Sequence, residues 1–317
     1  MACCPPSATW YRQLRAGTLP RSVDHKRQHW IPRGYLKAWC DPDAPQDQEP
    51  YVWQFARDGK SGRRRAPKKI FFESELYTLS SSDGLRDLSV EHSLAELESR
   101  FVAIREQKLL LDRALTPEEH VDVCAFIAVM HSRTPSQIDH HRSNWERAAE
   151  MGRRVRAAMD AGKSVPSLGI QTGPSLSLEQ VEELANAQRG DFVWPLVANQ
   201  LPVLCDMNLS VLATEDPIGF ITSDAPCVWF DPQAYLRPLH MQSPGLGYKT
   251  IEIGLPSSPN QMLVLSWLLR PGRIQINDQL LDELNRRTRF YAQDHFVVRC
   301  NVVRSEWFTV RTPPTSS

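Results

Sequence analysis

Two short segments place titratable side chains next to a proline, with apolar residues around them. The first, His29-Trp-Ile-Pro-Arg-Gly-Tyr-Leu, holds His29 near Pro32, which fixes φ and removes a hydrogen-bond donor. The second, Phe220-Ile-Thr-Ser-Asp-Ala-Pro, ends an apolar run on Ser223 and Asp224. A histidine on a rigid segment can act as a general base or a metal ligand, and a carboxylate can hold a divalent cation. This pattern makes His29 and Asp224 the first candidates for catalysis or metal binding.

Each segment also has a structural interpretation. His29 can be a core residue that hydrogen-bonds a backbone carbonyl. Ser223 and Asp224 can form a turn in which the side chains bond their own backbone. Ser223 is a candidate nucleophile, but the Gly-x-Ser-x-Gly pattern of the nucleophile elbow is absent around it.

Arg133 and Glu98 are the next candidates. Arg133 precedes Pro135 in an apolar helical pattern, where an arginine needs a carboxylate or a ligand anion as its partner. Glu91 and Glu98 are two helical turns apart, so they share one side of a helix, and Glu98 is a candidate metal ligand together with Asp224. The alternatives are a buried ion pair for Arg133 and a solvated face for the glutamates.

The helix expected from Thr116 carries two histidines, His120 and His131. They are about 16 Å apart along the helix axis, which is too far to share a metal ion. His120 and Cys124 have a spacing that can chelate zinc, but no second pair matches them. These histidines therefore predict no metal site.

A basic segment covers residues 60–69, Lys-Ser-Gly-Arg-Arg-Arg-Ala-Pro-Lys-Lys, and is expected at a hairpin. Such a cluster can bind phosphate groups or nucleic acid, with Arg63, Arg64, Arg65 and Lys68 as the contact residues. The alternative is a solvated loop, since no aromatic residues alternate with these charges.

The pattern of apolar residues predicts which elements position these groups. Helices are expected from Ser89, from Thr116, over 136–161 and from Ser177. Thr116 is the expected N-cap of its helix, with proline at the first helical position. Because of Pro195 and Pro202, we expect two segments or a kink between Asp191 and Asp206. A last helix is expected over 277–292. Strands are expected as hairpins at 51–56 with 69–72, 209–213 with 218–222, and 251–255 with 262–266, followed by a strand from His295.

Grouped helices and strands predict an α+β fold, with an antiparallel or mixed sheet and a central block of helices packed on it. We expect an irregular segment over 1–24, a single domain over 25–311 and a disordered tail over 312–317. The 37 Lys and Arg residues balance 37 Asp and Glu residues, so global charge indicates no polyanionic partner. Seven cysteines without a CxxC pair, no long apolar run and no secretory signal predict a cytoplasmic protein with no membrane association.

Taken together, these segments resemble a large, mostly bacterial and fungal family that is known only as a domain of unknown function. Its hallmark is His-x-x-Pro-x-x-Tyr-Leu-x-x-aromatic, which is similar to the segment from His29 to Trp39. Further likenesses are Leu97-Glu98, Arg133-Thr-Pro, Ile221–Pro226, Pro256–Pro259 and Asn285. The resemblance covers roughly residues 25–300 and implies one domain, but it carries no activity. The basic segment is not similar to a feature of this family.

Two hypotheses follow from these residues. In the first, the protein is a metal-dependent hydrolase that acts on a phosphate-containing substrate or nucleic acid. His29 is then the base or a ligand, Asp224 and Glu98 hold magnesium or manganese, and Arg133 neutralises phosphate charge. In the second, the protein is a non-catalytic binding or interaction protein, and the motifs around His29 and Asp224 are structural.

Overall fold

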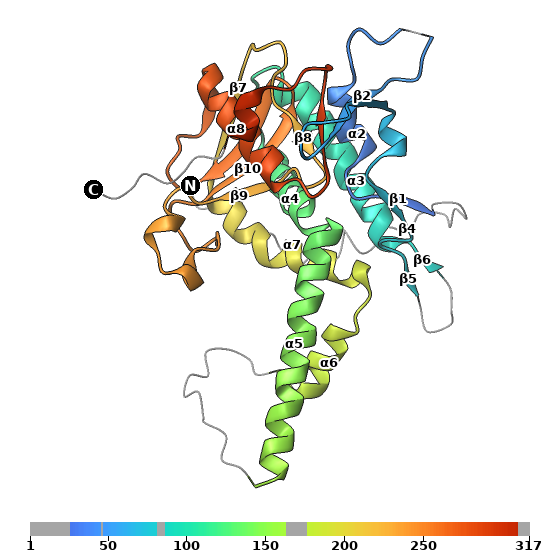
Figure 1. Ribbon diagram of the computed structural model, residues 1–317, viewed down its shortest axis with the longest axis vertical. Helices are drawn as coiled ribbons and strands as arrows, with labels where there is room; N and C mark the ends of the chain where they lie inside the picture. Colours follow the sequence, from blue (N-terminus) through green and yellow to red (C-terminus); the bar gives the residue numbers. More distant parts are fainter. Residues whose placement is uncertain (1–25, 46, 81–85, 163–175, 310–317) are drawn as a thin grey trace.

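The computed structural model describes residues 26–45, 47–80, 86–162 and 176–309. The predictions for segments 1–24 and 312–317 lie outside these residues. The described chain has an α+β fold, as predicted, with a block of helices against antiparallel and mixed sheets (Figure 1).

The larger sheet has five strands in the order β12-β7-β11-β10-β9. The neighbouring inner strands β10 and β11 form the predicted hairpin, and β12 is parallel to β7 while the other pairs are antiparallel. The strands are β7 (Asn208–Ala213), β9 (Val228–Phe230), β10 (Glu252–Ser258), β11 (Gln261–Ser266) and β12 (Gly272–Gln275).

The second sheet joins the two ends of the described chain. Its order is β3-β2-β13-β8, and all its pairs are antiparallel. The strands are β2 (Val52–Ala56), β3 (Arg63–Arg65), β8 (Thr222–Ser223) and β13 (His295–Val298). Two small ribbons pair β1 (Arg27–His29) with β4 (Phe72–Ser74), and β5 (Leu79–Ser80) with β6 (Arg86–Asp87). The strand expected over 69–72 to pair with β2 therefore does not form, because β3 takes that place and Phe72 belongs to β4.

Helix α4 (Pro117–Ser132) lies at the centre of the core. Its residues from Val123 to Met130 have no exposed surface, and a helix that is apolar on every side must be covered by other elements. Thr116 begins it as predicted, because its hydroxyl accepts the Glu119 N–H and its own N–H donates to the Glu119 carboxylate. The remaining helices are α2 (Arg33–Leu36), α3 (Ser89–Ile104), α5 (Pro135–Asp160), α6 (Leu178–Ala185), α7 (Arg189–Asp206) and α8 (Asp278–Tyr291).

Helix α7 continues through both prolines, so the first of the two expected forms, two separate segments, does not occur. Each proline removes one backbone donor and costs about 3 kcal/mol in a helix interior. Helix α7 packs against α4 through an apolar stripe, and this burial offsets the cost. The stripe consists of Val193, Val197, Leu201 and Leu204.

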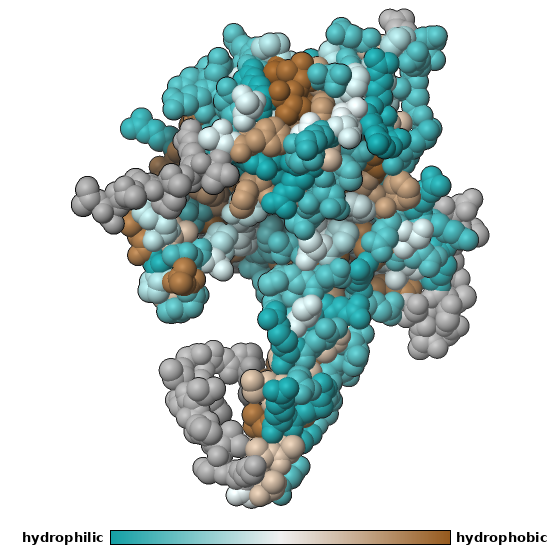
Figure 2. Space-filling view, in the orientation of Figure 1, coloured by the Kyte–Doolittle hydropathy of each residue, from teal (hydrophilic) through white to brown (hydrophobic). Residues whose placement is uncertain are grey.

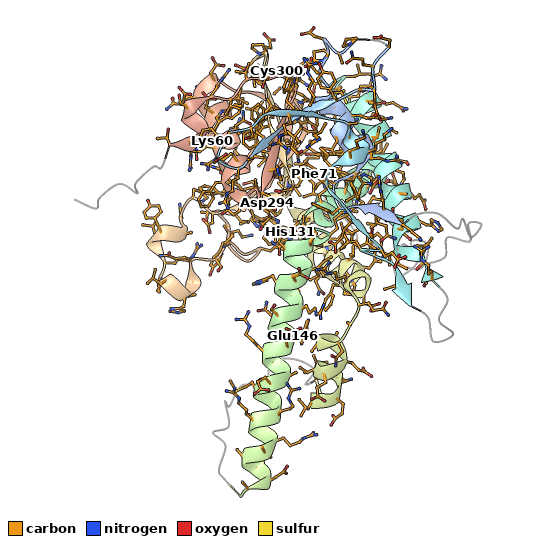
Figure 3. All side chains as sticks on the ribbon, turned by 45° about the vertical axis from the view of Figure 1, so that its right-hand side comes forward. Lys60, Phe71, His131, Glu146, Asp294 and Cys300 are labelled. Carbon is orange, nitrogen blue, oxygen red and sulfur yellow. The ribbon has the colours of Figure 1, made fainter. Side chains whose placement is uncertain are left out.

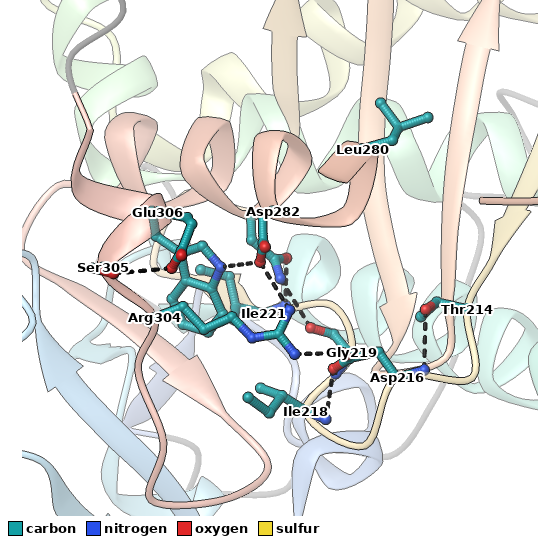
Figure 4. A network of polar contacts seen from close by, with 12 residues as sticks. Thr214, Asp216, Ile218, Gly219, Ile221, Leu280, Asp282, Arg304, Ser305 and Glu306 are labelled. Carbon is teal, nitrogen blue, oxygen red and sulfur yellow. Dashed lines mark hydrogen bonds and ion pairs between the residues drawn. The ribbon is translucent and has the colours of Figure 1, made fainter. Parts of the chain in front are cut away.

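The hairpin predicted for 209–213 and 218–222 is wrong. Strand β7 pairs with β11 and β12, and β8 pairs with β13 in the other sheet. The connecting loop turns away because the Asp216 carboxylate accepts the N–H groups of Ile218 and Gly219 and binds Arg304 (Figure 4). Gly219 has a φ of +72° and a Cβ there would collide with the backbone of Pro259, so only glycine fits this turn.

Helices α5 and α6 extend away from the two sheets as an arm with a mostly hydrophilic surface (Figure 2). Pro135 is the first residue of α5, with Thr134 as the N-cap, so the proline starts a new helix after α4. In the described part of the chain, no helix has both the length and the apolar character needed to cross a membrane.

Candidate functional site: a pocket lined by histidines

Aromatic side chains of the first motif hold the second motif in place. The hydrogen-bonded residues are 181 to 194 positions apart in the sequence. The contacts are Trp30 Nε1 to the Asp224 carbonyl at 3.0 Å, Tyr35 Oη to Thr222 Oγ1 at 2.8 Å, and Trp39 Nε1 to the Phe220 carbonyl at 2.8 Å. Tyr35 and Trp39 are fully buried, so these are core contacts that fix strand β8 against α2.

Asp224 is buried and its carboxylate accepts three backbone N–H groups. Oδ1 accepts from Gln293 at 2.8 Å, and Oδ2 accepts from Asp294 at 2.8 Å and from His295 at 2.9 Å. Burial raises the pKa of Asp224, and the three N–H donors act in the opposite direction with a smaller effect. These contacts anchor the start of β13, and they use three of the roughly four lone-pair sites of the carboxylate.

Ser223 is also buried, with no exposed surface. Its hydroxyl oxygen accepts the N–H of Ala225 at 3.2 Å, which is a local turn contact. Ser223 therefore makes the local turn contact of the structural interpretation. The Asp224 carboxylate instead binds backbone N–H groups 69 to 71 residues further along the chain.

Arg133 brings three elements together and is 1% exposed. Its guanidinium donates to the Glu98 carboxylate, to the backbone carbonyl of His29 and, at 3.5 Å, to the Tyr77 hydroxyl. Tyr77 in turn donates to the Arg133 carbonyl at 2.6 Å. Burial lowers the pKa of Arg133, but Glu98 and Tyr77 outweigh burial, and the pKa is raised above its already high value. Arg133 therefore has protein partners of its own at this position.

Two other groups near this ion pair have strongly shifted pKa values. Burial raises the pKa of Glu91 to about 7, with an opposing effect of Arg133 and a supporting effect of Glu98. Burial also lowers the pKa of His29 to about 4, and the His29 ring lies 3.4 Å from the Lys68 carbonyl. At pH 7 the His29 ring is neutral and packs against Phe72.

A cation site would need free oxygen or nitrogen lone pairs. Among the described residues, one group of three brings its ligand atoms within 4.8 Å of one another: Asp224, Asp294 and His295. Glu98 and His29 are not part of it. Three N–H dipoles already point at the Asp224 oxygens, and their positive ends oppose a cation there. The donor set therefore does not fit magnesium or manganese well.

The basic segment 60–69 forms a strand and a short helical turn. Arg63, Arg64 and Arg65 make up β3, an exposed edge strand, and the Arg64 guanidinium lies 4.9 Å from the Tyr51 ring centre and 5.0 Å from that of Trp53. Lys68 forms an ion pair with Glu49 at 2.5 Å. Lys68 also borders an open groove of about 950 Å³ that includes Glu98. Binding of nucleic acid or phosphate here stays a prediction.

A more enclosed pocket lies where α4 ends and α5 begins, with a volume of about 420 Å³. We call it the histidine pocket. In Figure 3, His131 lies at this junction, where the long helix meets the body of the protein. The pocket is lined from α4, α5, α7, α8 and the chain after β8, by Met130, His131, Thr134, Ser136, Gln137, His140, His141, Gln200, Ala225, Cys227, Trp229, Pro244, Tyr291 and Gln293.

Two buried polar atoms in this wall have no hydrogen-bond partner among the described residues: His131 Nδ1 and Gln200 Oε1. The His131 ring is stacked on Trp229, with the ring centres 4.3 Å apart and an angle of 14° between the planes. Burial lowers the pKa of His131 to about 4, with a further effect of His141, so the ring is neutral at pH 7. Buried polar atoms are nearly always satisfied, and both of these atoms belong to residues that line the histidine pocket.

The histidine pocket was not predicted from the sequence. The sequence pattern indicates His131 only as a possible metal partner of His120, and no motif marks His140, His141 or Gln200. One signal was available, since His131 lies two residues before Arg133 and Ala225 directly follows Asp224. The two motifs thus contribute the residues beside their polar positions to the pocket wall.

Lowering the pH from 7 to 5 should destabilise the protein through His131. Its pKa is about 4 when folded and about 6.5 when unfolded, so below pH 6.5 the unfolded chain binds a proton that the folded chain does not. The expected loss is up to about 2 kcal/mol at pH 5. In urea unfolding, His131→Phe, which keeps a ring on Trp229, should lose this part of the pH dependence. The exposed control His240→Phe should keep it, and an unchanged slope in His131→Phe would disprove the assignment.

Comparison with known proteins supports a family of unknown function. A family model described as a protein of unknown function, DUF4238, matches residues 27–301. No curated protein and no solved structure matches the chain. The matched range includes both motif segments, the Arg133 network and every residue that lines the histidine pocket. The chain belongs to the DUF4238 family of proteins of unknown function.

Proposed function

We propose that this protein binds a small molecule in the histidine pocket, and that the motif residues His29, Glu98, Arg133, Ser223 and Asp224 are the scaffold that holds the pocket wall. The observation that carries the proposal is the pair of unpartnered buried atoms, His131 Nδ1 and Gln200 Oε1, in one pocket of about 420 Å³. This volume is within the range of small-molecule sites.

The scaffold role rests on how the motif polar groups are used. Arg133 is bound to Glu98 and to the His29 carbonyl, and the Asp224 carboxylate holds three N–H groups. A metal-dependent hydrolase acting on a phosphate-containing substrate or nucleic acid would need these groups free for a cation, a phosphate and a proton. The contacts favour the non-catalytic alternative, and binding is therefore the function proposed.

A pocket-filling variant tests this proposal. Ala225 lines the pocket and is half-buried, so Ala225→Phe should fill it from one wall. The probe is a mixture of small aromatic and aliphatic acids, amides and alcohols. In the native protein we expect it to shift the backbone amide NMR signals of residues that line the histidine pocket. Ala225→Phe should abolish these shifts.

Ala157→Phe is the matched control, because Ala157 is exposed on α5 far along the helix from the pocket. It should leave the shifts unchanged. If the native protein shows no shifts at the pocket, or if the same shifts persist in Ala225→Phe, the histidine pocket is not the binding site.

A further inference from the structure

We propose that the ligand of the histidine pocket is a small aromatic carboxylate, with its carboxylate group at the N-terminus of α5. This inference rests on the proposed function and names the class of ligand. It follows from the start of α5 with its open Ser136 N–H, from the unpartnered Gln200 Oε1, and from the side chains that line the histidine pocket.

The start of α5 has no side-chain cap, although the Thr134 carbonyl accepts the N–H groups of Gln137 and Ile138 at 3.1 Å each. Thr134 is the N-cap but its side chain makes no capping bond, Pro135 has no N–H, and no acidic residue occurs in the first turn. The Ser136 N–H has no acceptor among the described residues. Thr134, Ser136 and Gln137 all line the pocket. A helix of 26 residues carries about half a positive charge at this end, which favours an anion beside it.

A second, independent observation comes from α7. Gln200 is 8% exposed and lines the pocket, and its Oε1 has no partner among the described residues. Its Nε2 lies 3.1 Å from the Ser132 hydroxyl, which can donate as well as accept. The Gln200 amide can therefore turn over and offer two N–H donors to an anion while Ser132 keeps its hydrogen bond.

The rest of the wall determines the charge and the body of the ligand. The described residues that line the pocket include no Lys, Arg, Asp or Glu. A phosphate dianion would lack a counter-cation there, whereas one negative charge matches the partial charge of the helix end. Trp229, Met130 and Tyr291 supply an aromatic and apolar surface against which a flat ring can pack.

Benzoate, its neutral isostere benzamide and inorganic phosphate are the probes. Amide signals of Ser136 and Gln137 and the indole signal of Trp229 report binding in a labelled sample of the full chain. We expect benzoate to bind about tenfold more tightly than benzamide, because a helix N-terminus stabilises an anion by up to about 2 kcal/mol in a partly buried site.

Each outcome has a distinct meaning. Equal binding of benzoate and benzamide at the pocket overturns the carboxylate inference and leaves the proposed function standing. Phosphate binding more tightly than benzoate, or no shift of the Ser136 and Gln137 signals with benzoate, also overturns the inference.

A charge placed at the helix start gives an independent test. Ser136→Asp supplies the missing negative charge and should weaken benzoate binding at least tenfold, while the neutral control Ser136→Asn should change it less than about threefold. The melting temperature of Ser136→Asp should equal or exceed that of the native protein, which shows that binding is lost without unfolding. Unchanged benzoate affinity in Ser136→Asp contradicts the inference. If that variant does not fold, the comparison of benzoate with benzamide in the native protein still decides it.

Discussion

Replacing Arg133 by methionine is expected to lower the free energy of unfolding by about 3–5 kcal/mol. The change leaves the Glu98 carboxylate without its partner, and it leaves the His29 carbonyl and the Tyr77 hydroxyl without a donor at the centre of the fold. Removing one member of a buried ion pair exposes the full cost of burying the other. Urea unfolding at pH 7 measures the difference.

A double-mutant cycle separates the ion pair from the packing of the long side chain. Arg133→Met combined with Glu98→Gln should be less destabilised than the sum of the two single variants, by at least about 1 kcal/mol. Arg142→Met is the control, since Arg142 pairs with Glu146 on the exposed face of α5 and should change stability by less than about 1 kcal/mol. A loss below 1 kcal/mol in Arg133→Met would show that Arg133 is available for a ligand instead.

Replacing Asp224 by asparagine should destabilise the protein by about 2–4 kcal/mol. One of the two carboxylate oxygens becomes an NH2 group that faces a backbone N–H of the segment 293–295, and the remaining hydrogen bonds lose their charge. The start of β13 should loosen first, so hydrogen exchange of the His295 amide should accelerate together with the fall in unfolding free energy.

The neighbouring acid provides the control for Asp224. Asp294 is exposed, and Asp294→Asn should leave stability within about 0.5 kcal/mol of the native value. Two results together would contradict the scaffold role of Asp224. Asp224→Asn would be as stable as the native protein, and manganese would stabilise the native protein but neither Asp224→Asn nor Asp294→Asn. The two carboxylates would then be metal ligands.

The sequence predicted the elements whose ends are defined by local chemistry. Thr116, Ser177 and Asn277 each cap a helix, because the side chain accepts the backbone N–H three residues later, and all three helix starts were predicted. The β10–β11 hairpin was predicted for the same reason, since neighbouring residues determine its turn. The α+β class was predicted from the grouping of helices and strands along the chain.

Elements that depend on distant partners were not predicted. Pro195 and Pro202 indicate a break in α7, but packing against α4 keeps the helix continuous. The strands β7 and β8 are close in sequence, yet each pairs with a strand more than 45 residues further along the chain, and the Asp216–Arg304 contact that separates them spans 88 residues. No local pattern contains this information.

In the candidate site too, neighbouring residues could be used for prediction and distant contacts could not. Residue type and a neighbouring proline identified His29, Arg133 and Asp224, and the structure places Arg133 against the His29 carbonyl and Trp30 against the Asp224 carbonyl. What these groups contact could not be predicted, because every partner comes from another element. The histidine pocket needs five such elements at once, and its histidines have no characteristic spacing in the sequence.

The most direct test of the central claim is a map of backbone amide signals in the native protein with benzoate. We expect shifts at His131, Ser136, Gln137 and Trp229 around the histidine pocket, and none at Lys68 or Arg33 in the groove that Glu98 lines. Shifts centred on His29, Lys68 and Arg33 with the histidine pocket silent would contradict it.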